Sequence, residues 1–423
     1  MNYKRINVNE GITLHKINTD KFKTNLIAVY LTTPLERKNI TEKALCIALL
    51  RRGTMKLKTQ EEINCKLEEL YGAEFNCGMD KLGNNEILKF YIESLNDEYT
   101  LKKEKILNKN IDLLFDIIFN PLTENNGFKS EYLKEEKENL KQIIEAKKDN
   151  KAQYSYSRLL EEMYGVDGYG LYTYGYAEDL NKITPQSLYE TYKKILSECK
   201  IDIFVSGNIS EEDILKVEEK IKELNLKPRK VENLYLKNEI KKKTTSREVI
   251  EKMEVTQGKL VIGLDIVDLN ENQRAACAVY NAILGGGANS KLFQNVREKS
   301  SLAYTAGSLY IKNKNNIIIK SGIEPKNYEK ATEIIKKQLE DMKNGIFEEK
   351  DIENAKKLII ASYEAIKDEQ DSSISYCFGQ ELECKEPDIQ SFVEKIKNVD
   401  KTKITDVAKK ININTIYFLT SNE

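Results

Sequence analysis

The chain of 423 residues contains a single histidine, His15. Counting therefore excludes a metal site with two histidine ligands, and it excludes a histidine base beside a separate histidine ligand. His15 lies in residues 11–17, whose alternation of apolar and polar side chains predicts a β-strand. Because no partner for it is visible in the sequence, we interpret it as a surface or strand histidine without a chemical role.

Cysteine pairs at metal-ligand spacing are also missing. The seven cysteines are an odd number and include no CxxC pair, so neither a disulfide framework nor a cysteine zinc site is indicated. Tryptophan is absent and only six prolines occur, while Lys, Asn and Ile are abundant. This composition is typical of an AT-rich bacterial genome, and we expect a bacterial source.

Long apolar runs are lacking as well. The first residues are too polar for a signal peptide, and no run of eighteen apolar residues occurs, so we expect no membrane span and a reduced cytoplasmic location. With 32% charged residues and a net charge of -1, the chain has no general attraction to nucleic acid or to an anionic membrane. A local site must therefore recognise any partner.

The sequence contains an internal repeat. Residues 128–149 can be laid on residues 347–368 without a gap, and both segments predict long amphipathic helices because apolar side chains recur at intervals of three and four. Other predicted elements fall in the same order in both halves. They are strands 25–31 and 259–266, helices 41–50 and 271–284, strands 86–93 and 316–323, helices 101–119 and 326–342, and strands 202–207 and 415–420.

The repeat predicts two homologous α+β halves, residues 1–225 and 246–423, each with an antiparallel sheet covered by helices on one face. Residues 226–245 between them are charged and have no clear periodicity, so we expect a linker there.

Residues 285–304 read Gly-Gly-Gly-Ala-Asn-Ser-Lys-Leu-Phe-Gln-Asn-Val-Arg-Glu-Lys-Ser-Ser-Leu-Ala-Tyr. This segment resembles the signature of the C-terminal half of the pitrilysin/insulinase and mitochondrial processing peptidase family. Residues 168–180 add a further likeness, and the two-half organisation extends the resemblance over nearly the whole chain. The resemblance implies the mitochondrial processing peptidase-like metallohydrolase fold. Active members are inverted zincins with an H-x-x-E-H helix and a distal glutamate ligand.

The resemblance can be tested at the zinc motif of the N-terminal half. Counting back from residues 53–54, the two histidines of the motif fall at Ala44 and Ala48, and the general base falls at Ile47. None of these side chains can bind a metal or accept a proton from water. The side chains of the helix that carries them are suited to packing against other apolar side chains.

The distal ligand of the family is a glutamate seven residues after another glutamate. If Glu136 matches the first glutamate, the ligand position falls at Ile143, which is again apolar. Glu145 lies nearby, but one glutamate would not rebuild a zinc site. The resemblance therefore implies an N-terminal half with a degenerate zinc site and no metal.

The C-terminal signature is intact, and its substrate-positioning residues fall at Arg297 and Tyr304. In the family these two side chains reach the substrate backbone, and a forked cation and a hydroxyl donor suit a developing oxyanion. The alternative is that Arg297 pairs with Glu298 or another carboxylate and that Tyr304 belongs to the core. With the resemblance, the substrate-binding interpretation is preferred. The glycines of residues 285–287 lack the Lys-Ser/Thr ending of a phosphate loop and are expected to end a helix.

Seven tyrosines occur between Tyr154 and Tyr176. Such a cluster is compatible with the lining of a peptide chamber, and equally with packing under a long loop.

The leading hypothesis is a non-catalytic subunit of a heterodimeric zinc endopeptidase that processes peptides or small unfolded proteins. Zinc and the general base would belong to the partner subunit, this chain would need no cofactor, and it would be inactive alone. The alternative is a catalytically inert peptide-binding or scaffold protein of the same fold, assembled as a homodimer. A metal-independent enzyme has little support, because His15 is the only histidine available as a base.

Overall fold

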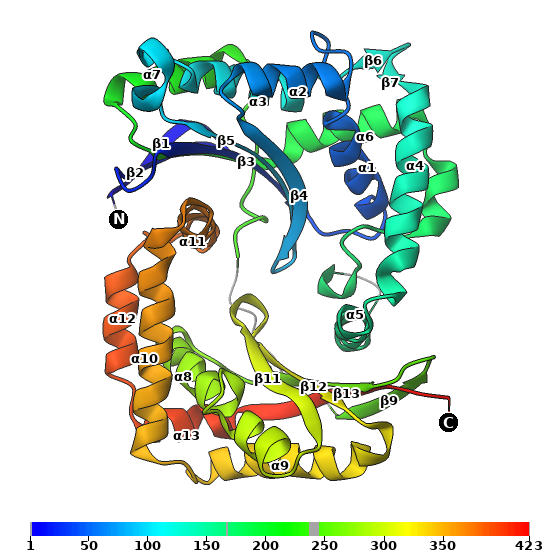
Figure 1. Cartoon of the computed structure of the whole chain (residues 1–423), viewed down its shortest axis with the longest axis vertical. Helices are drawn as coiled ribbons and strands as arrows, with labels where there is room; N and C mark the ends of the chain where they lie inside the picture. The colour runs from blue at the N-terminus through cyan, green and yellow to red at the C-terminus, as the bar shows by residue number, and fades with distance from the viewer. Residues whose placement is uncertain (1, 166–167, 237–244, 423) are drawn as a thin grey trace. The chain divides into compact units, whose positions relative to one another are not determined.

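The computed structural model describes residues 2–165, 168–236 and 245–422 (Figure 1). None of the helices in these ranges is long and apolar enough to cross a membrane. The chain forms two compact α+β units, and each has its own sheet and its own apolar core. Of the predicted linker, residues 237–244 lie outside the described residues.

The two units are not contiguous in sequence, because each takes one short segment from the other half of the chain. Their segments are Met1–Ala146, Asp167–Leu236 and Ile366–Pro387 in unit 1, and Lys147–Val166, Lys237–Ala365 and Asp388–Glu423 in unit 2. Hydrophobic periodicity shows that these segments are helical but does not show which sheet they cover.

The sheet of unit 1 has six strands. They are β1 Asn2–Asn9, β2 Ile12–Asn18, β3 Thr24–Pro34, β4 Glu74–Leu82, β5 Asn85–Leu95 and β8 Lys200–Gly207. Their order is β1-β2-β8-β3-β5-β4, and all neighbours are antiparallel except β2 and β8. The central strand β3 is apolar along most of its length, and every residue of β8 is buried, as expected for strands that are covered on both faces.

Helices of the N-terminal half cover one face of this sheet. They are α1 Ile40–Leu50, α2 Gln60–Glu69, α3 Leu107–Phe119, α4 Ser130–Glu145, α6 Pro185–Glu198 and α7 Glu211–Glu223. A short hairpin, β6 Thr123–Glu124 and β7 Gly127–Phe128, precedes α4. The apolar sides of α1, α3 and α6 form one core with the sheet.

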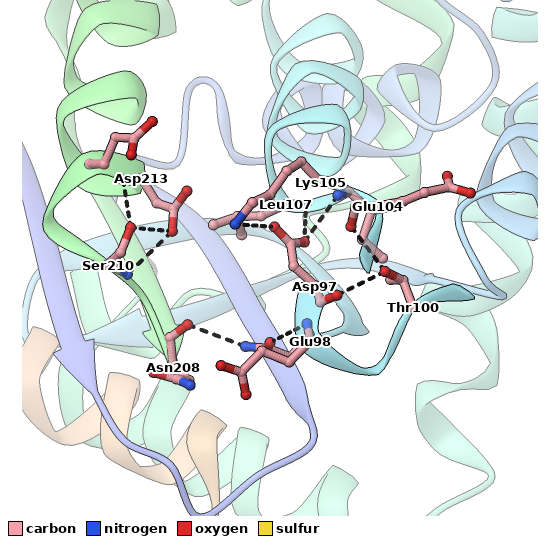
Figure 2. Close-up of polar contacts among 12 residues, drawn as sticks. Asp97, Glu98, Thr100, Glu104, Lys105, Leu107, Asn208, Ser210 and Asp213 are labelled. Carbon is pink, nitrogen blue, oxygen red and sulfur yellow. Dashed lines mark hydrogen bonds and ion pairs between the residues drawn. The ribbon is translucent and has the colours of Figure 1, made fainter. Parts of the chain in front are cut away.

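The loops at one end of this sheet are tied to the helices that follow them (Figure 2). The carboxylate of Asp97 accepts hydrogen bonds from the backbone N–H groups of Ile106 and Leu107, both at 3.0 Å, at the start of α3. Ser210 and Asp213 form a capping box at the start of α7. Buried backbone donors at both helix starts are thereby satisfied.

The opposite face of the unit 1 sheet is covered by α11 Gln370–Leu382, which comes from the C-terminal half. This helix lies against β3 and β8. Its Phe378 makes an edge-to-face contact with Tyr30, with ring centroids 4.9 Å apart, and Phe204 completes the aromatic cluster. Each such pair contributes about 0.5–1.5 kcal/mol beyond its buried area.

Unit 2 repeats this plan with five strands. They are β9 Arg247–Lys252, β10 Gly258–Ile266, β11 Ala303–Ile311, β12 Asn316–Ile323 and β13 Ile411–Thr420. The order is β11-β12-β10-β13-β9, and only β9 and β13 are parallel. The helices on one face are α8 Arg274–Gly285, α9 Tyr328–Lys343, α10 Glu349–Ala365, α12 Ile389–Lys397 and α13 Lys401–Lys409.

The second face of the unit 2 sheet is covered by α5 Lys151–Tyr164, which comes from the N-terminal half and lies against β10 and β13. Close approach requires a glycine at the contact. A Cβ atom at Gly263 would lie 2.2 Å from Sδ of Met163, so a larger residue there would force the Met163 side chain of α5 to move.

The α+β fold with two homologous halves is confirmed. The elements recur in the order β3, α1, β5, α3, α4, α5, β8 and β10, α8, β12, α9, α10, α11, β13. Helices α4 and α10 even end alike, each followed by a single 3₁₀ turn, Ala146–Lys148 or Ile366–Asp368. The structure adds a parallel strand pair to each sheet and a helix on its second face.

A buried ion cluster anchors α11 to unit 1. Glu381 of α11 accepts two hydrogen bonds from the guanidinium of Arg5, at 2.8 and 3.0 Å. Its carboxylate also lies 3.1 Å from Nζ of Lys200, which in turn contacts the carboxylate of Asp202. Lys200 and Asp202 have no solvent exposure.

The cluster is ionised at neutral pH. Burial opposes ionisation of Asp202 and Glu381, but Lys200 together with hydrogen bonds from His15 and Arg5 outweighs it and lowers the pKa of both carboxyl groups. Burial likewise opposes the charge of Lys200, and the two carboxylates more than compensate, so its pKa is raised. Two cations therefore face two anions, and the cluster is neutral as a whole.

Replacing Lys200 with methionine should weaken the attachment of α11. Two carboxylates would then face each other without their shared cation, which in a buried site costs about 3–5 kcal/mol. Urea unfolding and amide hydrogen exchange of α11 measure the loss. The matched control is Lys4→Met, which breaks an exposed pair with Glu211 and should cost at most about 1 kcal/mol. Equal effects of the two substitutions would contradict the anchoring role of the cluster.

Candidate functional site

The positions on α1 at which the resemblance expects two zinc ligands and the general base lie in or beside the core of unit 1. Ala44 and Ile47 are buried among the core side chains, and Ala48 is half-buried. The helix forms because Ala, Leu, Glu and Lys dominate its sequence and favour helix. Its side chains at these positions end in methyl groups, which cannot coordinate a metal.

The fourth position, Ile143, lies on α4, which packs against α1 in the same unit. Its side chain is 47% exposed. Glu136, one candidate carboxylate on this helix, is buried and pairs with Arg52 at 3.1 Å. Zinc takes nitrogen, oxygen or sulfur ligands, so the residues at these four positions do not fit it, and we derive no step that passes through a metal on this chain.

A lysine beside Ala44 forms an unusual ion pair. Nζ of Lys43 lies 3.1 Å from the carboxylate of Glu86 on β5, and both side chains are buried. The ammonium also donates a hydrogen bond to the carbonyl of Pro34 at 2.6 Å. Burial raises the pKa of Glu86 to about 7, although Lys43 opposes this rise. The pair ties α1 to the sheet and makes the attachment sensitive to pH.

Two open pockets of about 640 and 380 Å³ flank the start of α1. Each is lined by three acidic and three basic side chains, so neither has a net charge that would select an anion or a cation. The charged residues are Glu36, Glu42, Asp179, Arg37, Lys38 and Lys182 in the larger pocket, and Glu36, Glu42, Glu198, Lys38, Lys43 and Lys194 in the smaller.

His15 is buried on β2 and has partners that the sequence did not reveal. Its Nδ1 lies 2.7 Å from the hydroxyl of Tyr3, its Nε2 lies 2.9 Å from Asp202, and its ring stacks on Phe204. His15 lies on a strand, as predicted, but it is buried and has partners, so it is not a surface histidine. Asp202 is far away in sequence and comes close only because β2 pairs with β8.

One group in the described part of the chain brings three potential metal ligands together. It consists of His15, Asp202 and Glu381, whose ligand atoms lie within 4.8 Å of one another. Lys200 already contacts both carboxylates, and Arg5 balances the second one. A divalent cation would add uncompensated charge to a buried, neutral cluster, which is costly. We therefore assign this cluster to structure and not to metal binding.

The two residues predicted to bind substrate lie in unit 2. Arg297 is the last residue but one of the π-helical segment Phe293–Glu298. Its side chain is 44% exposed, and its Nε lies 3.5 Å from the carboxylate of Glu298. Its guanidinium also lies 4.5 Å from the ring centroid of Phe293. The ion pair named as the alternative is therefore present, but it is long and exposed and holds the arginine weakly.

Tyr304 is 70% exposed, so the alternative of a core tyrosine is wrong. It occupies a β-bulge at the start of β11, where Ala303 pairs with Ile323 and Thr305 already pairs with Gly322. The bulge leaves Tyr304 as the extra residue and turns its side chain outward. The position of both residues is compatible with substrate binding, which stays a prediction.

Gly285 lets β11 lie close to the end of α8. A Cβ atom there would lie 2.4 Å from the backbone nitrogen of Ser308. The hydroxyl of Ser308 donates to Oδ1 of Asn281 on α8 at 2.8 Å. The glycine segment thus ends a helix, as predicted, and fixes the strand that carries Tyr304.

The tyrosine-rich segment serves packing in both units. Tyr154 is buried in unit 2 beside Tyr417, and both hydroxyls donate to Glu251, at 2.6 and 2.9 Å. In unit 1 the ring of Tyr176 lies 4.0 Å from the guanidinium carbon of Arg37. The seven tyrosines are divided between the two units; Tyr154 is buried, Tyr174 is exposed and the other five are half-buried. The packing interpretation is therefore favoured for Tyr154.

The chain is similar to known proteins in sequence and in structure. The family described as "Peptidase M16 inactive domain" matches residues 182–359. The chain is 34% identical over 414 residues to the probable inactive metalloprotease YmfF of Bacillus subtilis (strain 168), and the match covers 98% of this chain and 96% of that protein. The chain belongs to the M16 peptidase family. This is the pitrilysin/insulinase-like family that the Arg-Glu-Lys signature indicated, and the chain is an inactive homologue within it.

Other M16 relatives and structures agree with this assignment. The chain is 24% identical to the uncharacterised zinc protease YmxG of Bacillus subtilis (strain 168), over 74% of this chain and 76% of that protein. A conserved protein from Enterococcus faecalis V583 superposes with a TM-score of 0.89 at 28% identity, covering 100% of this chain and 99% of that one. A peptidase M16 inactive domain from Pseudomonas fluorescens shares the fold, with a TM-score of 0.80 at 16% identity over 100% and 98% of the chains.

The purified M16 homologue should bind no stoichiometric zinc. A ligand that binds the native state at 100 times its Kd would stabilise it by about 2.7 kcal/mol. Without donors at Ala44, Ala48 and Ile143, neither added zinc nor a chelator should shift the thermal unfolding midpoint. Elemental analysis should be repeated on a Cys65→Ser/Cys384→Ser variant, since these thiols are exposed. One zinc per chain retained by that variant would refute the prediction.

Burial of Glu86, which the pairing with Lys43 only partly offsets, should make stability fall as pH rises. With its pKa raised from 4.5 to about 7, folded Glu86 binds its proton more tightly than the unfolded chain does. Its contribution is full below about pH 4.5 and is lost as pH rises through 7. Urea unfolding at pH 5 and pH 8 should therefore show a decrease that Glu86→Gln removes. Substitution of the exposed Glu178 with Gln should leave the decrease in place, and a decrease that survives Glu86→Gln would disprove the assignment.

Proposed function

We propose that this M16 homologue is the non-catalytic subunit of a heterodimeric zinc endopeptidase that processes peptides or small unfolded proteins. The zinc and the general base would come from a homologous partner subunit. This chain would contribute Arg297 and Tyr304, which hold the peptide backbone near the partner's metal. The seven free cysteines are in keeping with a reduced cytoplasmic location for the pair.

The observation that carries this proposal is a contrast between the two units. At the positions of unit 1 that the resemblance assigns to the zinc site, all four side chains are aliphatic, and they range from buried at Ala44 and Ile47 to exposed at Ile143. In unit 2, Arg297 and Tyr304 are exposed, and the ion pair of Arg297 with Glu298 is 3.5 Å long. An exposed guanidinium fork and a phenol offer donors to a carbonyl that develops charge, which is the chemistry that this part of a peptidase needs.

The second candidate is a peptide-binding or scaffold protein that works as a homodimer without proteolysis. The open edge of β11 favours it, because an edge strand can bind an extended peptide through its main chain alone. Under this candidate, Arg297 and Tyr304 would change peptide affinity but no turnover would exist.

Turnover of a quenched peptide by the mixed subunits separates the two candidates. The zinc-bearing partner would be the homologous H-x-x-E-H protein from the same organism. Removing one donor to a developing oxyanion costs about a hundredfold or more in kcat. We therefore expect Arg297→Ala and Tyr304→Phe to lower kcat by about that factor, after normal binding to the partner has been verified.

Matched controls come from exposed residues of the same type. Arg247 on β9 is 49% exposed and has a similarly long ion pair with Glu162, and Tyr99 is 51% exposed. Arg247→Ala and Tyr99→Phe should leave turnover unchanged. If all four variants behave alike, the assignment of Arg297 and Tyr304 to the substrate site fails.

A further inference from the structure

A loop of unit 1 is fixed at its base by buried hydrogen bonds. It comprises residues 96–105 and joins β5 to α3. The carboxylate of Asp97 accepts hydrogen bonds from two backbone N–H groups at the start of α3, and the hydroxyl of Thr100 donates to the carbonyl of Asp97 at 2.8 Å (Figure 2). The side chain of Asn96 donates to Oδ1 of Asn25 on β3 at 2.9 Å. Since Asn96, Asp97 and Thr100 are buried and bonded, the base positions the residues at the apex of the loop.

The apex of this loop is apolar and basic. Leu101 is 75% exposed, more than any other large apolar side chain in the described part of the chain, and Tyr99 is 51% exposed. Lys102 and Lys103 follow directly and are exposed. The exposed Lys23 lies beside them, with its Nζ 6.0 Å from the ring centroid of Tyr99. Two apolar side chains in contact with water are thus accompanied by three cations.

The two lysines of the apex lie at strained backbone positions. Lys102 and Lys103 are both left-handed, with φ of 59° and 53°. Glycine adopts such angles without steric cost, whereas a residue with a Cβ atom is strained there. Two consecutive lysines therefore do nothing for the backbone that glycine would not do better. Strain of this kind is typical of positions at which the side chain serves a function.

The positive charge of the apex is not neutralised within unit 1. The ion pairs at the base of the loop are Lys105 with Asp97 at 3.6 Å and Lys109 with Glu104 at 3.9 Å. Within the described residues, no carboxylate lies at ion-pair distance from Lys23, Lys102 or Lys103. Glu98 is the remaining acidic side chain of the loop, so three lysines against one glutamate leave an excess of two positive charges. The chain as a whole has a net charge of -1, so attraction to an anionic surface is confined to this apex.

We propose that the apex of this loop binds the surface of a membrane that contains anionic phospholipids. Leu101 enters the boundary between headgroups and acyl chains, the ring of Tyr99 lies at the level of the headgroups, and the lysines reach the phosphates. Surface binding of this kind needs no membrane-spanning helix. The inference goes beyond the proposed function and does not rest on it, because it concerns a loop of unit 1.

The size of the apex favours a lipid surface over a protein partner. A stable protein interface buries about 800 Å² on each partner, which the few side chains of one loop do not supply. A bilayer instead accepts a single apolar side chain and pairs the surrounding cations with phosphates. Because one leucine and three lysines provide less than a lipid anchor does, binding should be weak, reversible and sensitive to salt.

Sedimentation of the full chain with sucrose-loaded vesicles tests the inference. One vesicle preparation contains phosphatidylcholine alone, and the other contains phosphatidylcholine mixed with phosphatidylglycerol. At low salt the chain should sediment with the anionic vesicles and stay in the supernatant with the neutral ones. Raising the salt concentration from about 50 mM to about 500 mM should release it, because the charges are then screened.

Two variants change the apex without disturbing the base of the loop. Lys102→Gly/Lys103→Gly removes two charges and relieves two strained backbone angles. Vesicle binding should fall about tenfold or more, while the thermal unfolding midpoint stays the same or rises. Leu101→Ser should also weaken vesicle binding. A structural role of the lysines would instead lower the unfolding midpoint.

Matched controls remove the same groups elsewhere. Lys330→Gln/Lys336→Gln removes two exposed charges from α9, and Leu215→Ser changes a leucine that is 59% exposed on α7. Both controls should leave vesicle binding unchanged.

Three outcomes would overturn the inference. They are equal sedimentation with neutral and anionic vesicles, equal losses of binding in the apex variants and their controls, and no sedimentation with either vesicle. In the last case an acidic protein surface would replace the membrane as the partner to be sought. Because every arm uses the chain alone and no peptide, a failure here leaves the turnover experiment on Arg297 and Tyr304 untouched.

Discussion

Both faces of each central strand in this protein have to be covered, and the chain meets this demand by exchanging one helix between its halves. Strands β3 and β10 are apolar along nearly their whole length, so an uncovered face would leave a large hydrophobic surface in water. The helices α11 and α5 provide the second layer. The need to cover these faces accounts for the contacts that each helix makes with its sheet. They include the ion cluster around Lys200 at α11 and the glycine at position 263 beside α5.

The exchanged helices are held in different ways. Helix α11 relies on aromatic packing and on a buried cluster in which two cations balance two carboxylates. Such a cluster contributes little net stability compared with an apolar replacement, but it penalises any other position of the helix, because each alternative leaves a charge buried and unpaired. Helix α5 relies on close packing at Gly263 and on the hydrogen bond from Tyr154 to Glu251 of β9. The position of α11 is therefore selected by charge pairing, and the position of α5 is selected by the shape of the packed surfaces.

The predicted zinc positions of unit 1 and the predicted substrate residues of unit 2 meet opposite physical requirements. Aliphatic side chains at the zinc positions remove any need for a metal to compensate buried ligands, and the fold of unit 1 is retained. In unit 2, by contrast, Tyr304 and the uncharged edge of β11 expose apolar and unpaired groups that bring a risk of aggregation. A surface that is unfavourable for solubility is typical of a binding site, and Tyr304 lies on such a surface.

Much of the fold was determined by local sequence, because periodicity and the repeat of residues 128–149 in residues 347–368 depend only on neighbouring side chains. The prediction that Ala44, Ala48 and Ile143 replace zinc ligands, and that Ile47 replaces the general base, likewise needs only the motif. The tertiary structure decided what depends on long-range contact: the exchange of α5 and α11, the partners of His15, and the exposure of Tyr304. His15 meets Asp202 only through the register of β2 with β8, and Tyr304 turns outward only because of a bulge against β12. Strand register and helix docking are set by the burial of whole faces, which no short stretch of sequence encodes.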